Sequence, residues 1–314
     1  MHRTAAQRSL RSRLTGYGNP LSLFLFLLPG FGVYLLLMLW PSMQSLYYSL
    51  VEWNGLSTNI TFVGLENFTR MAGDRVVRIA LENGLRNLFL LLAFQVPVGF
   101  LLAYLLSQQV RGRRVFVFCY FLPILISEAT MALLWSLIYN GRAGLLNGVL
   151  TSIGLEALIV PWLSRNGTVQ WAVLIPGVLQ WLGFNVVLFL AAIDGIPQEL
   201  FEVARLEGAT ALQEVRHVTL PGVRGVYVTA VILAIAGGIS PFLYPFILTN
   251  AGPLDLTQTL MTYSFEKIYA AGGLNRNLEW GYGSALGVLH LVIGLALSGL
   301  TWYLGRLNRE RWQA

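Results

Sequence analysis

The pattern of hydrophobic and polar positions divides the chain into six long apolar segments joined by more polar connections. The apolar segments cover residues 21–50, 82–107, 114–140, 168–193, 222–248 and 284–305. A helix that spans a bilayer needs about 20 mostly apolar residues, and each of these segments is long enough. The pattern therefore predicts an all-α integral membrane protein with six transmembrane helices.

Prolines and glycines mark two of these helices as irregular. Pro41 predicts a bend or fraying in the first helix. The fifth segment contains Gly237, Gly238, Pro241 and Pro245, which predict a break in its second half. Such breaks are tolerated at membrane depth where the backbone packs on protein or lines a cavity.

The composition agrees with a membrane protein. Hydrophobic residues make up 55% of the chain and charged residues only 11%, whereas soluble domains carry about 25% charged residues. The single cysteine, Cys119, forms no internal disulfide. The three histidines lie far apart in sequence, so we expect no metal site.

The distribution of positive charge predicts the orientation in the membrane. With the N-terminus in the cytoplasm, thirteen of the 21 Lys and Arg residues fall on that side. The positive-inside rule then places both termini in the cytoplasm. We expect a basic N-terminus at 1–20, a transmembrane domain at 21–305 and a cytoplasmic tail at 306–314. The net charge of +6 is explained by topology, so no nucleic-acid partner is expected.

One cytoplasmic connection, residues 196–221, is unusually polar, and its pattern predicts two short helices. Pro197 suits the first turn of the first helix, and Gly208 suits a left-handed cap at its end. Thr210 and Gln213 form a capping box that begins the second helix. Neither helix is long enough to be stable alone in water, so each must pack against something.

The acidic residues of this segment favour a protein partner over the membrane surface. Helices that lie on membranes usually carry Lys and Arg on the polar face, whereas this segment carries Glu199, Glu202, Glu207 and Glu214. An anionic inner leaflet would repel them. Contact with membrane lipid at the surface is the alternative interpretation.

Several stretches resemble a known family. EVA at 202–204, EGA at 207–209 and LP at 220–221 are similar to the EAA loop of importer-type ABC transporter permeases, with Val203 in place of the usual middle alanine. The wider resemblance is to sugar-uptake permeases of the maltose type, through residues 27–55, 64–68, 120–127, 144–147, 248–265 and 282–288. The resemblance covers nearly the whole chain.

The resemblance implies a multi-subunit importer in a bacterial or archaeal plasma membrane. It implies that a separate ATPase dimer docks on Glu202, Ala204, Glu207, Gly208, Ala209, Leu220 and Pro221. It also implies a second, homologous permease subunit that completes a heterodimer, an extracytoplasmic solute-binding protein and a sugar-like substrate.

Nothing in the sequence predicts an ATPase site in this chain. A phosphate-binding loop needs G-x-x-x-x-G-K-[ST], and the only lysine, Lys267, lies in SFEKIY. We therefore expect no catalytic residue and no cofactor here, with ATP and Mg²⁺ bound by the partner ATPase.

The substrate path is expected between the spans, where polar residues are costly and often functional. Glu128, near the middle of the third segment, and Asn185 are the polar candidates. Trp181, Phe242 and Tyr244 offer flat faces to sugar rings, although such rings in membrane bundles are often packing residues. Alternatively, Glu128 pairs with a group on the partner subunit, or it faces a wet cavity or is protonated without touching substrate.

Three other functions are considered. A secondary transporter needs no docking loop and commonly shows internal repeats, which are not evident here. An ABC permease for a non-sugar solute stays open, because the sequence does not define the substrate. A hydrolase built on Ser284 and His290 is disfavoured, since residues six apart on a helix point to different faces. We expect His290 to be hydrogen-bonded within the bundle.

Overall fold

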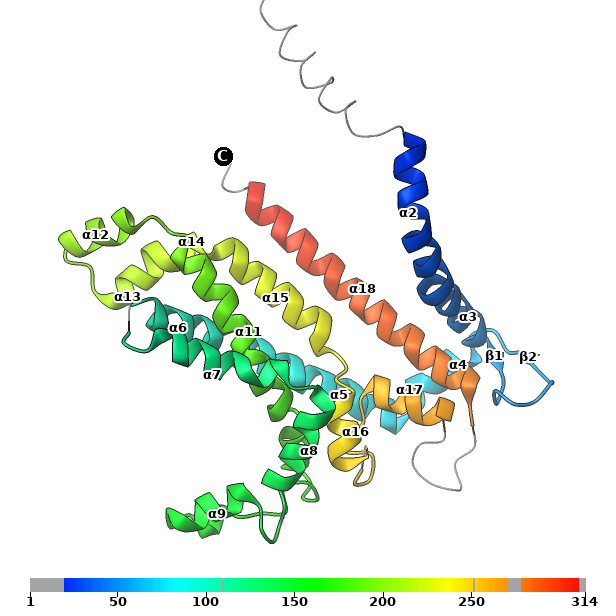
Figure 1. The fold of residues 1–314 in the computed structure, drawn as a ribbon. Coiled ribbons are helices and arrows are strands. Elements are labelled where there is room, and N and C mark those ends of the chain that lie inside the picture. Colours follow the sequence, from blue (N-terminus) through cyan, green and yellow to red (C-terminus); the bar gives the residue numbers. More distant parts are fainter. Residues whose placement is uncertain (1–19, 109, 251, 270–277, 311–314) are drawn as a thin grey trace, which may run out of the picture.

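The computed structural model describes residues 20–108, 110–250, 252–269 and 278–310, and most of these residues are helical (Figure 1). The elements are α2 (Pro20–Tyr34), η1 (Leu35–Leu39), α3 (Trp40–Tyr48), β1 (Val51–Glu52), β2 (Thr61–Phe62), α4 (Glu66–Gly73), α5 (Arg75–Leu90), η2 (Leu91–Gln95), α6 (Val96–Ser107), α7 (Arg113–Leu125), α8 (Glu128–Ile138), α9 (Leu145–Ser152), η3 (Glu156–Leu158), α10 (Val169–Ala172), α11 (Ile175–Asp194), α12 (Gln198–Leu206), α13 (Ala211–Glu214), η4 (Val215–Thr219), α14 (Leu220–Gly222), α15 (Arg224–Gly238), α16 (Leu243–Thr249), α17 (Leu260–Tyr269) and α18 (Trp280–Glu310). Strands β1 and β2 form a short antiparallel pair. Nearly all of the predicted N-terminal region and residues 311–314 of the tail lie outside the described residues.

The predicted membrane helices are present, as four continuous spans and two bent ones. Leu23–Tyr48, Arg75–Ser107, Val169–Asp194 and Trp280–Thr301 are each long and apolar enough to cross a membrane. Two further pairs of consecutive helices are also long and apolar enough when each pair is taken together. They bend sharply, by 101° between α7 and α8 and by 74° between α14 and α15. The all-α fold with six spans is confirmed when each bent pair counts as one span.

Three prolines explain three wider turns inside the helices. The π-turns η1, η2 and η4 each end two residues before a proline: Pro41, Pro97 and Pro221. The residue after each π-turn donates its N–H to the carbonyl five residues earlier. Proline lacks an N–H and crowds the preceding turn, and a π-turn makes room for it. The irregularity predicted at Pro41 is thus a π-turn, and the helix continues to Tyr48.

Two spans are broken: the third between α7 and α8, and the fifth between α15 and α16. The sequence predicts only the second of these breaks. The break in the fifth segment is confirmed, since α15 ends at Gly238 and α16 begins at Leu243. The sequence predicts the third segment, 114–140, as one span, and the structure divides it into two helices. Its chain breaks after Leu125, and the Ser127 hydroxyl caps α8 by accepting the Thr130 N–H. Glu128 is therefore the first residue of α8 and not the middle of a straight span.

Buried amides on α5 hold the broken fifth span in place. Asn87 Nδ2 donates to the Gly238 carbonyl at 2.8 Å, at the end of α15. Asn83 Nδ2 donates to the Leu256 and Gln258 carbonyls, both at 2.8 Å, beyond α16. Carbonyls at a helix end have no partner in the helix, and leaving them unpaired in a membrane is costly. Asn87 supplies such a partner at the end of α15, and Asn83 attaches the connection between α16 and α17 to α5.

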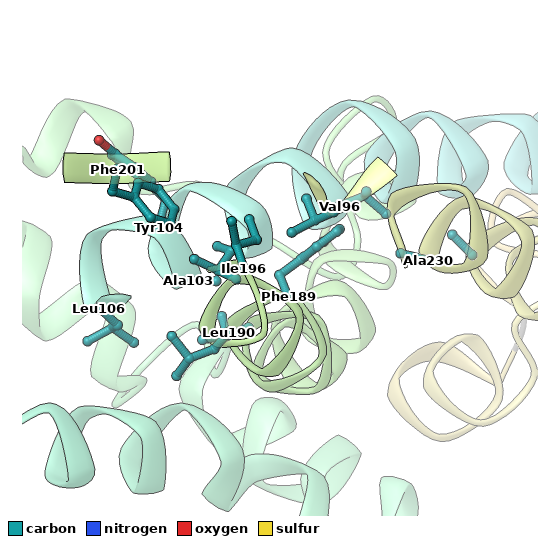
Figure 2. Close-up of a cluster of buried hydrophobic side chains, with 13 residues drawn as sticks. Val96, Ala103, Tyr104, Leu106, Phe189, Leu190, Ile196, Phe201 and Ala230 are labelled. Atoms are coloured by element: carbon teal, nitrogen blue, oxygen red, sulfur yellow. The ribbon is translucent and has the colours of Figure 1, made fainter. Parts of the chain in front are cut away.

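The largest hydrophobic cluster lies where α6 crosses α11 (Figure 2). Phe189 of α11 is fully buried and packs edge to face on Phe100, with ring centroids 5.6 Å apart. Phe201 of α12 and Val223, at the start of α15, join the same cluster. The cluster therefore connects the loop at 196–221 to two membrane spans.

Asp74 joins three helices at the opposite end of the molecule. It caps α5 by accepting the Val76 N–H at 2.8 Å, and it accepts the hydroxyls of Tyr263 on α17 and Tyr282 on α18. Burial alone would raise the pKa of Asp74, but these hydrogen bonds lower it below the usual 3.8. The ionised carboxylate is thus the form that stabilises this junction.

Acid should weaken this junction in a way that depends on Asp74. A carboxyl group whose pKa is lowered by folding stabilises the protein above its unfolded pKa, and the effect is lost as the pH falls through the folded pKa. We expect Asp74→Asn to cost about 1–3 kcal/mol near neutral pH and to reduce the drop in Tm between pH 7 and about pH 3. Thermal unfolding in detergent at both pH values measures this. Glu156→Gln, at an exposed position in η3, serves as control; an Asp74→Asn variant with the wild-type acid response contradicts the assignment.

Candidate functional site

A cavity of about 570 Å³ lies among the broken spans and gathers the predicted substrate-path residues. It is bordered by α5, η2, α8, α11, α15 and the start of α16. Its lining includes Glu128, Trp181, Asn185, Phe242 and Tyr244. Asn87 and Gln95 add polar groups that the sequence analysis missed. Residues from three distant segments therefore meet as expected, and their contact with substrate stays a prediction.

Glu128 has a partner within its own chain. The indole Nε1 of Trp181 donates to Glu128 Oε1 at 3.1 Å. An ionised carboxylate offers about four acceptor positions, so this bond holds the group at the cavity wall and leaves capacity for hydroxyl donors. The polar group predicted to bind sugar hydroxyls is thus oriented by the aromatic residue predicted to stack on the ring.

The three aromatic candidates have different surroundings. Trp181 is 44% exposed, so its ring is accessible from the cavity. Phe242 stacks on Phe246, with ring centroids 5.2 Å apart, and meets Phe265 edge to face. Tyr244 is buried, and its hydroxyl donates to Gln180 Oε1. Trp181 is therefore the residue best placed to touch a solute, while the other two shape the wall.

Asn185 belongs both to the cavity wall and to a close helix crossing. It is buried on α11 and lines the cavity. A Cβ at Gly99 of α6 would lie only 2.7 Å from the Cβ of Asn185. Glycine at position 99 therefore lets α6 approach α11 at this level.

The loop at 196–221 has the predicted helix–glycine–helix form. Gly208 has a φ of +76°, which favours glycine, and the Ala209 N–H returns to the Ala204 carbonyl at 2.9 Å. The capping box is confirmed, because Gln213 Oε1 accepts the Thr210 N–H and the Thr210 hydroxyl accepts the Gln213 N–H. Both helix ends inside the loop are thus fixed by local hydrogen bonds.

The outer surface of this loop exposes large apolar side chains. Leu206 is 88% exposed and Leu212 is 77% exposed. Among the predicted docking residues, Glu202, Glu207, Gly208, Leu220 and Pro221 are exposed, and Ala204 and Ala209 are half-buried. Leu206 and Leu212 were missed in the sequence, although a leucine on either side of a cap glycine in a polar loop is the signal that marks them. A surface of this kind fits a protein partner.

One of the four acidic residues in the loop turns inward. Glu214 is 5% exposed and accepts hydrogen bonds from Tyr104, at 3.3 Å, and from Gln108, at 3.4 Å, while its other oxygen lies 3.3 Å from Arg205 Nε. Glu214, which is not among the predicted docking residues, therefore does not belong to the acidic surface of the loop. Its hydrogen bonds attach the loop to the end of α6.

His290 does not match its expected role. Its buried Nδ1 has no hydrogen-bond partner among the described residues. Within the same part of the chain, no group of three or more His, Cys, Asp or Glu residues is placed to hold a metal ion.

A cavity walled by broken spans, combined with a rigid two-helix loop, defines the permease class of membrane transport proteins. The chain belongs to the family of binding-protein-dependent transport system inner membrane components, whose model matches residues 95–309. The match includes the cavity-lining residues from Gln95 onward and the entire 196–221 loop.

Two relatives match over most of their length. The chain is 33% identical to the probable ABC transporter permease protein YurN of Bacillus subtilis, covering 93% of this chain and 98% of the relative. It is 31% identical to the diacetylchitobiose uptake system permease protein NgcF of Streptomyces coelicolor, covering 88% and 80%.

The fold also matches a solved structure. A chain of a bacterial ABC transporter involved in the import of the acidic polysaccharide alginate superposes with a TM-score of 0.77 at 21% identity, covering 90% of this chain and 94% of that one. A second structure of an alginate ABC transporter, in complex with an alginate pentasaccharide-bound periplasmic protein, gives 0.76 at 22% identity, covering 90% and 93%.

Proposed function

We propose that this chain is the transmembrane permease subunit of an ATP-driven ABC importer that moves a sugar or sugar-like solute inward by alternating access. The observation that carries the proposal is the 196–221 loop. It exposes Leu206 and Leu212, yet Phe201 and Glu214 attach it firmly to the spans around the cavity. A partner that moves this loop would therefore move the cavity walls.

The partner on this loop is an ATPase dimer that binds ATP and Mg²⁺. Glu202 and Glu207 accept charge-assisted hydrogen bonds from it, while the exposed leucines fill apolar pockets. Figure 1 places the start of α2, the end of α18 and the loop α12–α13 in the upper part of the view, and α4, α16 and α17 in the lower part. The upper side is cytoplasmic in this proposal, as the positive-inside rule predicts.

A second, homologous permease subunit forms a heterodimer with this chain. The first span, Leu23–Tyr48, is apolar, and in the described structure its membrane window has no buried residues. In Figure 1 α2 stands away from the other spans, and α3 approaches α18. A face this large and apolar suits another membrane helix bundle, with lipid around the remainder.

The solute is an oligosaccharide or a related polyol delivered by an extracytoplasmic binding protein. Sites for small molecules usually have volumes of about 300–1,000 Å³ and combine apolar walls with a few polar groups. The cavity has this size and this mixture. Glu128 and Asn185 accept or donate hydrogen bonds to hydroxyls, and Trp181 stacks on a sugar ring.

The docking proposal predicts the effect of charging the exposed leucines. The double substitution Leu206→Asp with Leu212→Asp should reduce co-purification of the ATPase at least about tenfold, because buried apolar anchors carry much of the energy of an interface. Both residues are exposed in this chain, so its melting temperature should not change. Pull-down from membranes that contain the complete transporter measures the effect.

The matched control is Leu254→Asp, which charges another highly exposed leucine far from the loop. It should retain the ATPase at the wild-type level. Full ATPase recovery with the double variant would show that this loop is not the docking site.

The role of Glu128 predicts a specific kinetic change. Glu128→Gln keeps the size of the side chain but replaces a charged acceptor with a neutral one. The difference between a charged and a neutral hydrogen bond is about 1–1.4 kcal/mol, so KM for the transported sugar should rise about five- to tenfold. Vmax should change by less than about twofold if only binding is affected. Initial uptake rates into proteoliposomes give both values. An unchanged KM would support the alternative that Glu128 faces water in the cavity and does not contact the solute.

A further inference from the structure

Gln180 on α11 connects the two broken spans next to the cavity. Its side chain is 2% exposed, and it lies behind the cavity wall, not in it. We propose that Gln180 is a positioning residue for transport: it holds the α7–α8 break and α16 in one arrangement around the cavity. This inference rests on the proposed function for its transport readout, whereas its structural readout is independent.

The first connection runs from Gln180 to the break in the third span. Its Nε2 donates to the Ile126 carbonyl at 2.8 Å and to the Pro123 carbonyl at 3.2 Å. Pro123 lies in the last turn of α7, and Ile126 lies between α7 and α8. The Pro123 carbonyl also accepts the Ile126 N–H at 3.3 Å, while the Ile126 carbonyl lies between the two helices, where carbonyls lack the partners that a continuing helix would supply. The amide therefore stabilises the sharp turn itself.

The second connection runs from Gln180 to the fifth span. Its Oε1 accepts the hydroxyl of Tyr244, which is buried near the start of α16. The Tyr244 ring lies close to Gly177, one turn before Gln180, where a Cβ would be 3.3 Å from the ring. Donor and acceptor ends of one amide thus bind two different broken helices.

Through these hydrogen bonds, Gln180 fixes the positions of residues that face the cavity. Glu128 follows Ile126 by two residues, and its partner Trp181 is the next residue after Gln180. Breaks between helix segments are where spans reorient during a conformational change. Because both broken spans are bound to one buried amide, a reorientation of either span must break its own contact with Gln180 or move Gln180 with it.

The structural test measures the break directly. Spin labels at Leu122→Cys on α7 and Leu137→Cys on α8, both exposed positions, report the distance across the break. Cys119→Ala removes the single native cysteine. In the complete transporter, we expect a narrow distance distribution for Gln180 and at least a twofold broader one for Gln180→Met. A distribution for Gln180→Met that equals the wild type overturns the proposal.

Two further variants separate the two connections. Tyr244→Phe removes only the bond to α16, so the distribution between Leu122 and Leu137 should stay narrow. Gln180→Glu, measured at a pH at which its carboxyl group is ionised, keeps an acceptor for Tyr244 but cannot donate to the carbonyls, so it should broaden the distribution as Gln180→Met does. The reverse result, broadening by Tyr244→Phe alone, contradicts the assignment of the two ends of the amide.

The transport test separates positioning from general stability. Gln180→Met should raise KM for the transported sugar roughly tenfold in the reconstituted complex, since the cavity wall loses its fixed shape. Asn67→Leu removes another buried amide, which binds the Ser49 and Val51 carbonyls and does not line the cavity, and should leave KM within about twofold. A Gln180→Met variant with less folded complex and a lower Vmax but the wild-type KM would show a purely structural role. Failure of ATP-dependent uptake in the wild type would instead overturn the proposed function, and the distance measurement would still stand.

Discussion

Gly183→Ala is expected to destabilise the protein strongly, by about 3 kcal/mol or more. A Cβ at this position of α11 would overlap the backbone carbonyl of Tyr120 on α7. Backbone atoms in a packed helix cannot move aside as a flexible side chain can, so the two helices must separate. The loss of folded protein in detergent, and the fall in Tm of what remains, measure the effect.

The control for this substitution is Gly225→Ala. Gly225 is also helical, in α15, but a Cβ there would meet open space. Alanine favours a helix over glycine by up to about 1 kcal/mol, so Gly225→Ala should keep or slightly raise Tm. A Gly183→Ala variant as stable as Gly225→Ala would show that α7 and α11 are farther apart than described here.

Gly208→Asp is expected to abolish coupled transport without unfolding the chain. Gly208 has a φ of +76°, and a Cβ there meets open space, so the cost within this chain is about 1–2 kcal/mol of backbone strain. The new carboxylate instead points into the surface proposed to bind the ATPase. We expect ATP-driven uptake to fall at least about 100-fold, because an unpaired charge buried in an interface costs several kcal/mol.

Gly154→Asp is the matched control for this substitution. Gly154 has a φ of +75°, and a Cβ there also meets open space, but it lies in the loop after α9. It should suffer the same strain and keep normal uptake. Equal losses with both variants would mean that strain, and not docking, explains the effect.

Local signals in the sequence were enough to predict much of the loop. Gly208, Thr210 and Gln213 act on neighbouring residues through short-range hydrogen bonds, so their roles follow from sequence spacing alone. The apolar segments predict the spans because a membrane helix forms its backbone hydrogen bonds within its own segment, so that this signal is also local.

Other features depend on contacts between distant segments. The inward position of Glu214 requires Tyr104 and Arg205 beside it, and no short pattern indicates that. The break before Glu128 had one local signal, the capping residue Ser127, but no short pattern indicates that Gln180 from α11 donates to the Ile126 carbonyl at the break. Tertiary hydrogen bonds of this kind are what a single sequence does not reveal.

The candidate cavity is predicted in part from local signals and depends in part on contacts between distant segments. The residues predicted from polarity and aromatic character do line one space, because polar residues inside a membrane bundle turn toward wet or protein-lined interiors. Their individual roles differ, however, since Tyr244 is bonded to Gln180 and Phe242 is stacked on Phe246. Only the structure separates residues that can touch a solute from those that shape its surroundings.

The most direct test of the central claim is sugar uptake into proteoliposomes that contain this chain, its partner permease and the ATPase, with the solute-binding protein outside. Uptake of a labelled oligosaccharide is compared with ATP inside the vesicles and with a proton or sodium gradient in place of ATP. The proposal predicts uptake only with ATP, and its loss when the Leu206→Asp, Leu212→Asp double variant is used. Uptake that is driven by an ion gradient alone, and that persists without the ATPase, would identify a secondary transporter and contradict the account.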